Sequence, residues 1–247
     1  MNNHSIKGFT LIELSAVILI IGIIISSVSY GLNLADQARL RSVITEANEY
    51  MEAINLFEQK YGNLPGDIPT ASDLWGTTCD ATPSNCNGNG DGVIYYSSSL
   101  LKNEAMRAWQ HLSLAGMIRG SYTGIASIAN QTDIGVNAPE SKYSNGGWSI
   151  YYHQPYNPPY DTGQSLIIGM FQANSLPGNS LIIPLDAYNI DTKIDDGLPR
   201  TGLVWGDSAT TFCFVNATYV DSPYNIVNTT TPACILSFIF RKPNLWF

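Results

Sequence analysis

The chain has 247 residues and a net charge of −8, with 13% charged residues, 11% aromatic residues, 21 glycines and 13 prolines. This length holds one membrane anchor and one folded domain, and the composition favours a loop-rich, β-containing extracytoplasmic domain over a cytosolic helical enzyme. The acidic balance argues against a nucleic-acid partner for the folded domain, because no basic patch is present to displace counterions from phosphates.

Residues 14–35 form an uncharged, largely apolar stretch of 22 residues. About 20 apolar residues span the hydrocarbon core of a bilayer as a helix. The stretch is too long for the core of an ordinary secretory signal, and no small-residue cleavage site follows it. The sequence therefore predicts a membrane anchor that the chain retains.

A helical pattern continues beyond the anchor, with polar and charged residues between regularly spaced apolar ones. The apolar residues recur at spacings of three and four: Leu40, Val43, Ala47, Tyr50, Ile54, Phe57 and Tyr61. Such a narrow seam is typical of a water-exposed helix that packs one side on a globular domain. Gly62 and Pro65 end the pattern. We expect one helix from Phe9 to Tyr61, about 80 Å long, with its first half in lipid.

The sequence GFTLIE at residues 8–13 resembles the processing motif of type IV prepilins and of the pseudopilins of type II secretion systems. The resemblance implies that prepilin peptidase cuts between Gly8 and Phe9 and methylates the new amino group of Phe9. Residues 1–8 are then a cleaved leader, and the apolar helix survives in the mature chain.

Glu13 is an acid at the head of the apolar stretch. A carboxylate in hydrocarbon costs several kcal/mol unless it is paired, and the amine of Phe9 lies about one helical turn away. The family resemblance implies that Glu13 neutralises the terminal amine of a neighbouring subunit and so sets the register of assembly. The alternative is a glutamate that reaches the lipid headgroups from a solitary anchor.

One feature of the anchor departs from the family pattern. Many major subunits carry a proline near the position of Tyr30, whereas Gly22 and Gly31 are the breakers here. Glycine weakens a helix by about 1 kcal/mol relative to alanine, and proline by about 3 kcal/mol. Local unwinding is less strongly encoded, so the sequence leaves a major, repeating role and a minor role both open.

The four cysteines are Cys79, Cys86, Cys213 and Cys234. Four cysteines allow three pairings, and the local spacings favour Cys79–Cys86 and Cys213–Cys234. These spacings match neither redox CxxC motifs nor zinc sites. Disulfides are expected outside the cytosol, and four free buried thiols are the alternative.

The loop NGNGDGVI resembles the first two-thirds of an EF-hand-type calcium loop. Asn87, Asn89 and Asp91 take the first, third and fifth ligand positions, and the carbonyl of Val93 takes the seventh. The twelfth position is Ser98 instead of glutamate. A turn rich in glycine and asparagine explains the composition equally well.

Regular elements are expected throughout the folded domain. Helices are predicted at residues 100–118 and at 184–197, where Pro184 marks a start and Gly197 a stop. Strands are predicted at Trp148–His153, Ser165–Phe171, Gly202–Trp205, Thr211–Ala217 and Ile235–Arg241. The fold class is therefore α+β, a pilin-like fold with the long helix packed on an antiparallel sheet. Its parts are a leader at 1–8, a transmembrane and assembly helix at 9–32, an amphipathic helix half at 33–61 and a globular head at 62–247.

A second acidic cluster, Asp191, Asp195 and Asp196, lies beside a glycine and a proline. Similar segments occur in pilin-like proteins, and the resemblance implies calcium in a C-terminal loop of some members. We favour an acidic helix end followed by a turn.

No catalytic set emerges from the histidines His4, His111 and His153, and the chain is predicted not to be an enzyme. The aromatic segment at 148–160 is interpreted as core and interface, with glycan binding as the alternative.

The predicted function is a structural filament subunit of a type IV pilus or a type II secretion pseudopilus. The alternative is a minor subunit at a filament tip that contacts secreted substrate, DNA or a host surface; a membrane-tethered enzyme is the third class. Implied partners are other pilin-like subunits, prepilin peptidase and an inner-membrane assembly platform. The implied location is the inner membrane with a periplasmic head, and then the filament.

Overall fold

The computed structural model describes residues 10–97, 99, 101–153, 163–207, 212–216, 222–227 and 230–241. The predicted cleavage site at Gly8 and Phe9 and the loop position Ser98 lie outside these residues. The described chain forms two compact units, Met1–Arg39 and Leu40–Phe247.

Helix α1 (Leu11–Tyr61) begins in the first unit, where the apolar segment Leu11–Val28 has no burial at all. Its length and composition suffice to cross a membrane. Large aliphatic side chains surround it on every side, as expected of a helix whose solvent is lipid. The described residues confirm the predicted helix up to its end at Tyr61.

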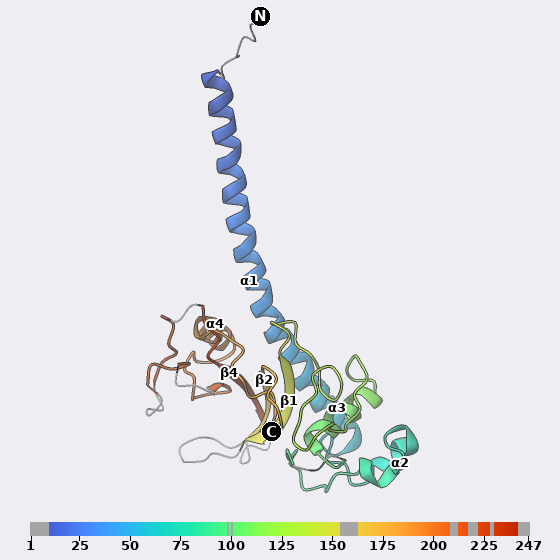
Figure 1. Ribbon diagram of the computed structural model, residues 1–247. Helices are drawn as coiled ribbons and strands as arrows, with labels where there is room; N and C mark the ends of the chain where they lie inside the picture. Colours follow the sequence, from blue (N-terminus) through green and yellow to red (C-terminus); the bar gives the residue numbers. More distant parts are fainter. Residues whose placement is uncertain are drawn as a thin grey trace, which may run out of the picture. The chain divides into compact units, whose positions relative to one another are not determined.

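The second half of α1 lines the core of the head, beside β1 and α3 (Figure 1). The predicted seam is buried at Leu40, Val43, Ala47, Ile54 and Phe57, and Tyr50 and Tyr61 pack partly against the core. The Tyr50 ring lies 5.0 Å from that of Trp109 and 5.6 Å from that of Trp148, both edge to face. These pairs add to the area burial of the seam. The seam is confirmed.

The sheet of the head is antiparallel with strand order β1-β2-β4-β3. Its strands are β1 (Gly147–His153), β2 (Gly163–Gly169), β3 (Val204–Asp207) and β4 (Ile235–Arg241). All seven residues of β2 are buried, and β2 lies between β1 and β4 in the sheet. The α+β class is confirmed, and the predicted bounds of β4 are correct.

Two predicted elements end earlier than expected. The helix predicted at 100–118 is α3 (Glu104–Leu114), and Gly116 follows it with a left-handed φ of 70°. The helix predicted at 184–197 is α4 (Pro184–Ile194). Short helices that the sequence did not suggest are α2 (Ala71–Trp75), Gly76–Thr78 and Pro83–Cys86.

The strand predicted at Thr211–Ala217 is wrong in its described part, residues 212–216. That part makes only an isolated bridge between Phe214 and Tyr224. Val215 N donates to the carbonyl of Pro223 at 3.0 Å. Proline has no N–H to return to Val215, so the pairing does not extend past this residue.

Glu46 lies between seam residues yet is only 5% exposed. Its carboxylate accepts hydrogen bonds from Ser141 Oγ at 2.7 Å, Lys142 N at 3.0 Å and Trp148 Nε1 at 2.8 Å. This buried acid thus ties α1 to β1 and to the loop before it.

We expect Glu46→Ala to lower the free energy of unfolding of the head by about 3 kcal/mol, since it leaves buried donors unsatisfied. Urea unfolding of the full chain in detergent micelles, followed by tryptophan fluorescence, measures the change. Glu49→Ala is the matched control, because Glu49 is exposed on the same helix. Equal unfolding midpoints for the two variants would contradict the role of Glu46.

Candidate functional site

The amino-terminal end of α1 is closed by a ring of hydrogen bonds between Thr10 and Glu13. Glu13 Oε2 accepts from Thr10 N at 2.9 Å and from Thr10 Oγ1 at 2.8 Å. Thr10 Oγ1 in turn accepts from Glu13 N at 3.3 Å. This is a capping box, which supplies partners to N–H groups that the helix itself leaves without acceptors. The acid also lies at the end of the helix where the backbone dipole favours negative charge.

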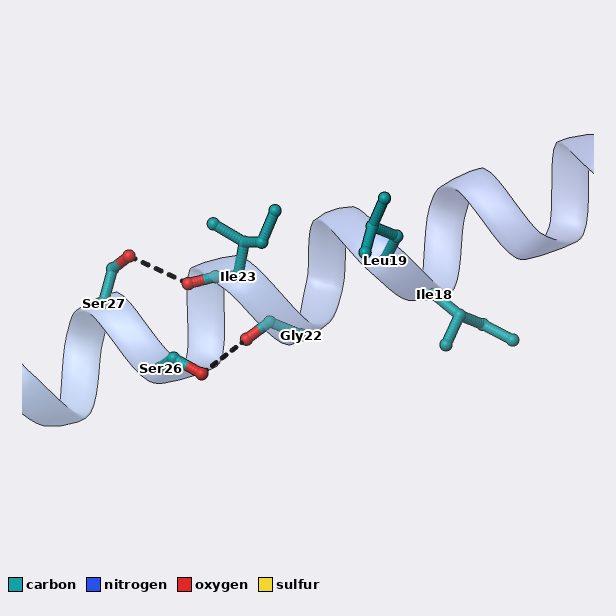
Figure 2. A pocket seen from close by; sticks show the side chains of 6 residues that line it. All are labelled: Ile18, Leu19, Gly22, Ile23, Ser26 and Ser27. Atoms are coloured by element: carbon teal, nitrogen blue, oxygen red, sulfur yellow. Dashed lines mark hydrogen bonds between the residues drawn. The ribbon is translucent and has the colours of Figure 1, made fainter.

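Behind Glu13 the helix presents a largely apolar surface that includes a shallow groove. Figure 2 shows the groove, lined by Ile18, Leu19, Gly22, Ile23, Ser26 and Ser27. Ser26 Oγ donates to Gly22 O at 2.9 Å, and Ser27 Oγ donates to Ile23 O at 2.8 Å. Both hydroxyl groups are therefore satisfied within the helix and leave no unmet polar group on its apolar surface.

In the loop predicted to bind calcium, the side-chain ligand oxygens accept hydrogen bonds from α2 and from the loop itself. Asn87 Oδ1 accepts from Ser72 N at 2.7 Å, and Asn89 Oδ1 accepts from Asp91 N at 3.0 Å. Asp91 accepts from Val93 N at 2.9 Å and from Asn89 Nδ2 at 2.9 Å. The turn explanation accounts for these contacts, and calcium binding at this loop stays a prediction.

Two buried carboxylates accept hydrogen bonds from backbone N–H groups of the same loop. No periodic pattern in the sequence indicates that either carboxylate is buried. Asp67 accepts from Gly90 N at 2.7 Å and Gly92 N at 2.9 Å. Glu104 accepts from Asn89 N at 3.2 Å and Tyr95 N at 3.0 Å. Burial raises the pKa of Asp67 and raises the pKa of Glu104 to about 7.

Next to this loop, the Cys79–Cys86 disulfide lies against His111. Gly66 N donates to His111 Nδ1 at 2.9 Å, so the ring proton is on Nε2, which lies 3.2 Å from Cys86 O. Burial lowers the pKa of His111 to about 3. The ligand atoms of Cys79, Cys86 and His111 lie within 4.8 Å of one another, but sulfurs in a disulfide offer no thiolate to a metal.

Both predicted disulfides form. Cys79–Cys86 joins Cα atoms 6.0 Å apart, and Cys213–Cys234 joins Cα atoms 5.0 Å apart. The second fastens the isolated bridge at Phe214 to the start of β4.

The acidic cluster Asp191, Asp195 and Asp196 brings three carboxylates within 4.8 Å of one another. Asp191 accepts from Gly197 N at 3.1 Å and from Tyr224 Oη at 2.9 Å, and burial raises its pKa to about 7. Asp195 accepts hydrogen bonds from Leu203 N and Val204 N. Asp196 accepts hydrogen bonds from Leu198 N and Thr201 Oγ1. Three carboxylates are a hard-oxygen donor set suited to calcium, so this cluster can hold a metal.

We expect Glu104→Gln to flatten the pH dependence of head stability between pH 4.5 and 7. The pKa of Glu104 is higher in the folded chain than the ordinary 4.5, so protonation favours folding and this contribution is lost as the pH rises toward 7. One such group changes the free energy of unfolding by at most about 1.4 kcal/mol per pH unit. Urea midpoints at pH 5, 6, 7 and 8 measure it, and parallel profiles for parent and variant would contradict it.

The comparisons with known proteins point to one family. The family described as "Prokaryotic N-terminal methylation motif" matches residues 3–29. The chain is 33% identical over 96 residues to the "Type IV narrow pilus major component PilA5" of Thermus thermophilus. The match covers 34% of this chain and 82% of that protein. No solved structure matches significantly. The chain therefore belongs to the type IV pilin family.

Proposed function

We propose that this pilin-like filament subunit is cut between Gly8 and Phe9, methylated at Phe9 and assembled into a type IV pilus. The methylation motif at residues 3–29 supports the processing step. The related Thermus thermophilus protein is named as a major component of a pilus, and this favours a pilus over a type II secretion pseudopilus. Prepilin peptidase and an inner-membrane assembly platform are the partners that such a route requires, with the head in the periplasm before assembly.

The observation that carries the proposal is a single capped acid, Glu13, at the head of a fully exposed apolar helix. The helix needs a hydrocarbon environment on all sides, which lipid supplies before assembly and neighbouring helices supply afterwards. The terminal amine of Phe9 on a neighbouring copy is a cation of the right charge for Glu13. Attraction between the two is far stronger in that low-dielectric layer than in water, although desolvation offsets part of it.

A tip-located minor subunit is the second candidate. It is favoured by the glycines at 22 and 31 in place of a proline. The match to the major pilus component also leaves most of the head uncovered. In this role the head would be a binding module, and the copies would be few.

We expect Glu13→Leu to be inserted and processed normally but to be absent from filaments. Sheared filaments are quantified by mass spectrometry, and N-terminal mass analysis checks for methylated Phe9. Glu49→Leu, on the exposed side of the second half of α1, should assemble like the parent. Equal incorporation of Glu13→Leu would contradict the pairing. Gold labelling of the parent along the shaft supports the repeating role, and labelling confined to one end supports the tip role.

For the loop at Asn87, Asn89, Asp91 and Val93 we propose calcium as the bound ion. We expect about 1 mM calcium to raise the melting temperature of the full chain relative to chelator, because a ligand that binds only the folded state stabilises it. Asp91→Asn should abolish the rise. A rise that survives this change but is lost in Asp195→Asn would move the site to the acidic cluster, and no rise in the parent would contradict both sites.

A further inference from the structure

A polar cavity of about 380 Å³ opens on the head beside the start of α3. Its volume lies within the range of small-molecule sites, about 300 to 1,000 Å³. All of its lining residues belong to the compact unit Leu40–Phe247, so the membrane-spanning segment has no part in it. The side chains that line the cavity are those of Asn87, Asn89, Tyr95, Ser97, Lys102 and Glu104.

Glu104 supplies a nearly buried acceptor to this cavity. The residue is only 9% exposed, and its two carboxylate oxygens accept from Asn89 N at 3.2 Å and from Tyr95 N at 3.0 Å. A carboxylate has about four acceptor positions, so each oxygen retains room for another donor. Within the described part of the chain, no ion pair involves Glu104. A buried acid with unfilled acceptor positions favours a ligand that brings hydrogen-bond donors.

Two donors at the same cavity have no protein acceptor. Asn87 Oδ1 accepts from Ser72 N at 2.7 Å, so the side-chain oxygen of Asn87 is engaged and its Nδ2 remains. Neither Asn87 Nδ2 nor Lys102 Nζ donates a hydrogen bond to any residue that the structure describes. The cavity therefore offers donors as well as acceptors, and a ligand rich in hydroxyl groups satisfies both, because a hydroxyl donates and accepts.

The charges around the cavity select against ions of either sign. Burial, and then the charges of Asp67 and Asp91, raise the pKa of Glu104 to about 7, and the same two acids repel an anionic ligand. The ammonium group of Lys102 lines the cavity and repels a cationic one. An uncharged ligand has neither cost.

Tyr95 adds an aromatic surface to the cavity. Its ring lies 6.0 Å from that of Tyr152 at an interplanar angle of 70°, an edge-to-face contact that restrains the ring. The side chain is nevertheless 39% exposed. An exposed and restrained aromatic ring beside polar groups suits a ligand that has both an apolar face of C–H groups and a rim of hydroxyl groups.

We propose that this cavity binds one neutral hexose unit of a saccharide. The hydroxyl groups of the sugar donate to the Glu104 carboxylate and accept from Asn87 Nδ2 and Lys102 Nζ. The C–H face of the sugar ring packs on Tyr95. The inference goes beyond filament assembly and applies equally to a repeating subunit and to a subunit at the tip.

Saturation-transfer NMR of the full chain tests the cavity with four probes, the methyl glycosides of glucose, galactose, mannose and N-acetylglucosamine. The chain is held in micelles of a detergent whose headgroup is not a sugar, and a chelator removes calcium. We expect at least one probe to bind with a dissociation constant on the order of 1 mM.

Two variants locate the binding. Asn87→Asp keeps an acceptor for Ser72 N and replaces the Nδ2 donor with an oxygen of similar size, and we expect it to weaken sugar binding about tenfold. Tyr95→Ala should weaken it about threefold to tenfold. The matched control is Tyr188→Ala, because Tyr188 is 38% exposed on α4 and lies outside the cavity. It should bind like the parent.

The result separates this inference from the proposed calcium loop. Aspartate is the usual first ligand of an EF-hand-type loop, so Asn87→Asp should strengthen any calcium binding while it weakens sugar binding. The inference is overturned if none of the four probes binds the parent, or if binding requires calcium. It is also overturned if Asn87→Asp and Tyr95→Ala bind the sugar like the parent, or if Tyr188→Ala loses as much affinity as they do.

Discussion

The constraint on which the rest of this structure depends is that the first half of α1 is stable only in an apolar surrounding, yet carries a carboxylate there. Lipid satisfies the aliphatic side chains but offers nothing to an acid. The structure gives that acid a first partner in Thr10. A helix that must be covered on all sides and carries a charge that needs a counter-charge is suited to packing against copies of itself.

The same helix changes its surroundings without a break at about Leu40, where the head begins. From there its apolar side chains join the core of the head, where Tyr50 packs edge to face on Trp109 of α3 and Trp148 of β1. Two acids of α1 add polar ties, Glu46 to the loop before β1 and Glu58 to Arg241 of β4 at 2.9 Å. The hydrophobic seam provides the buried apolar area, and the acids fix the register of the helix on the sheet. The second half of α1 is therefore an integral part of the head.

Acids in the head repeatedly serve as acceptors for backbone N–H groups. Asp67, Glu104 and Asp191 are all buried, and each holds a turn that has no ladder or helix to satisfy its donors. A loop-rich domain has many such donors, and buried N–H groups without partners are costly. Several acidic residues that contribute to the negative charge of the chain are thus buried inside the head.

What the sequence determined by itself is what depends on near neighbours along the chain. The anchor follows from an uninterrupted apolar run, the seam from Leu40 to Phe57 from helical periodicity, and the two disulfides from short spacing outside the cytosol. The tertiary structure alone decided which polar groups are internal. Glu46 looks like a surface acid until Trp148 donates a hydrogen bond to it, and Asp67 and Glu104 look like surface acids until each accepts backbone N–H groups of the loop at 89–95. Thr211–Ala217 alternates like a strand, but Pro223 opposite it has no N–H to donate. The burial and hydrogen bonding of these residues depend on contacts with segments that are distant in the sequence. A local sequence pattern does not predict such contacts.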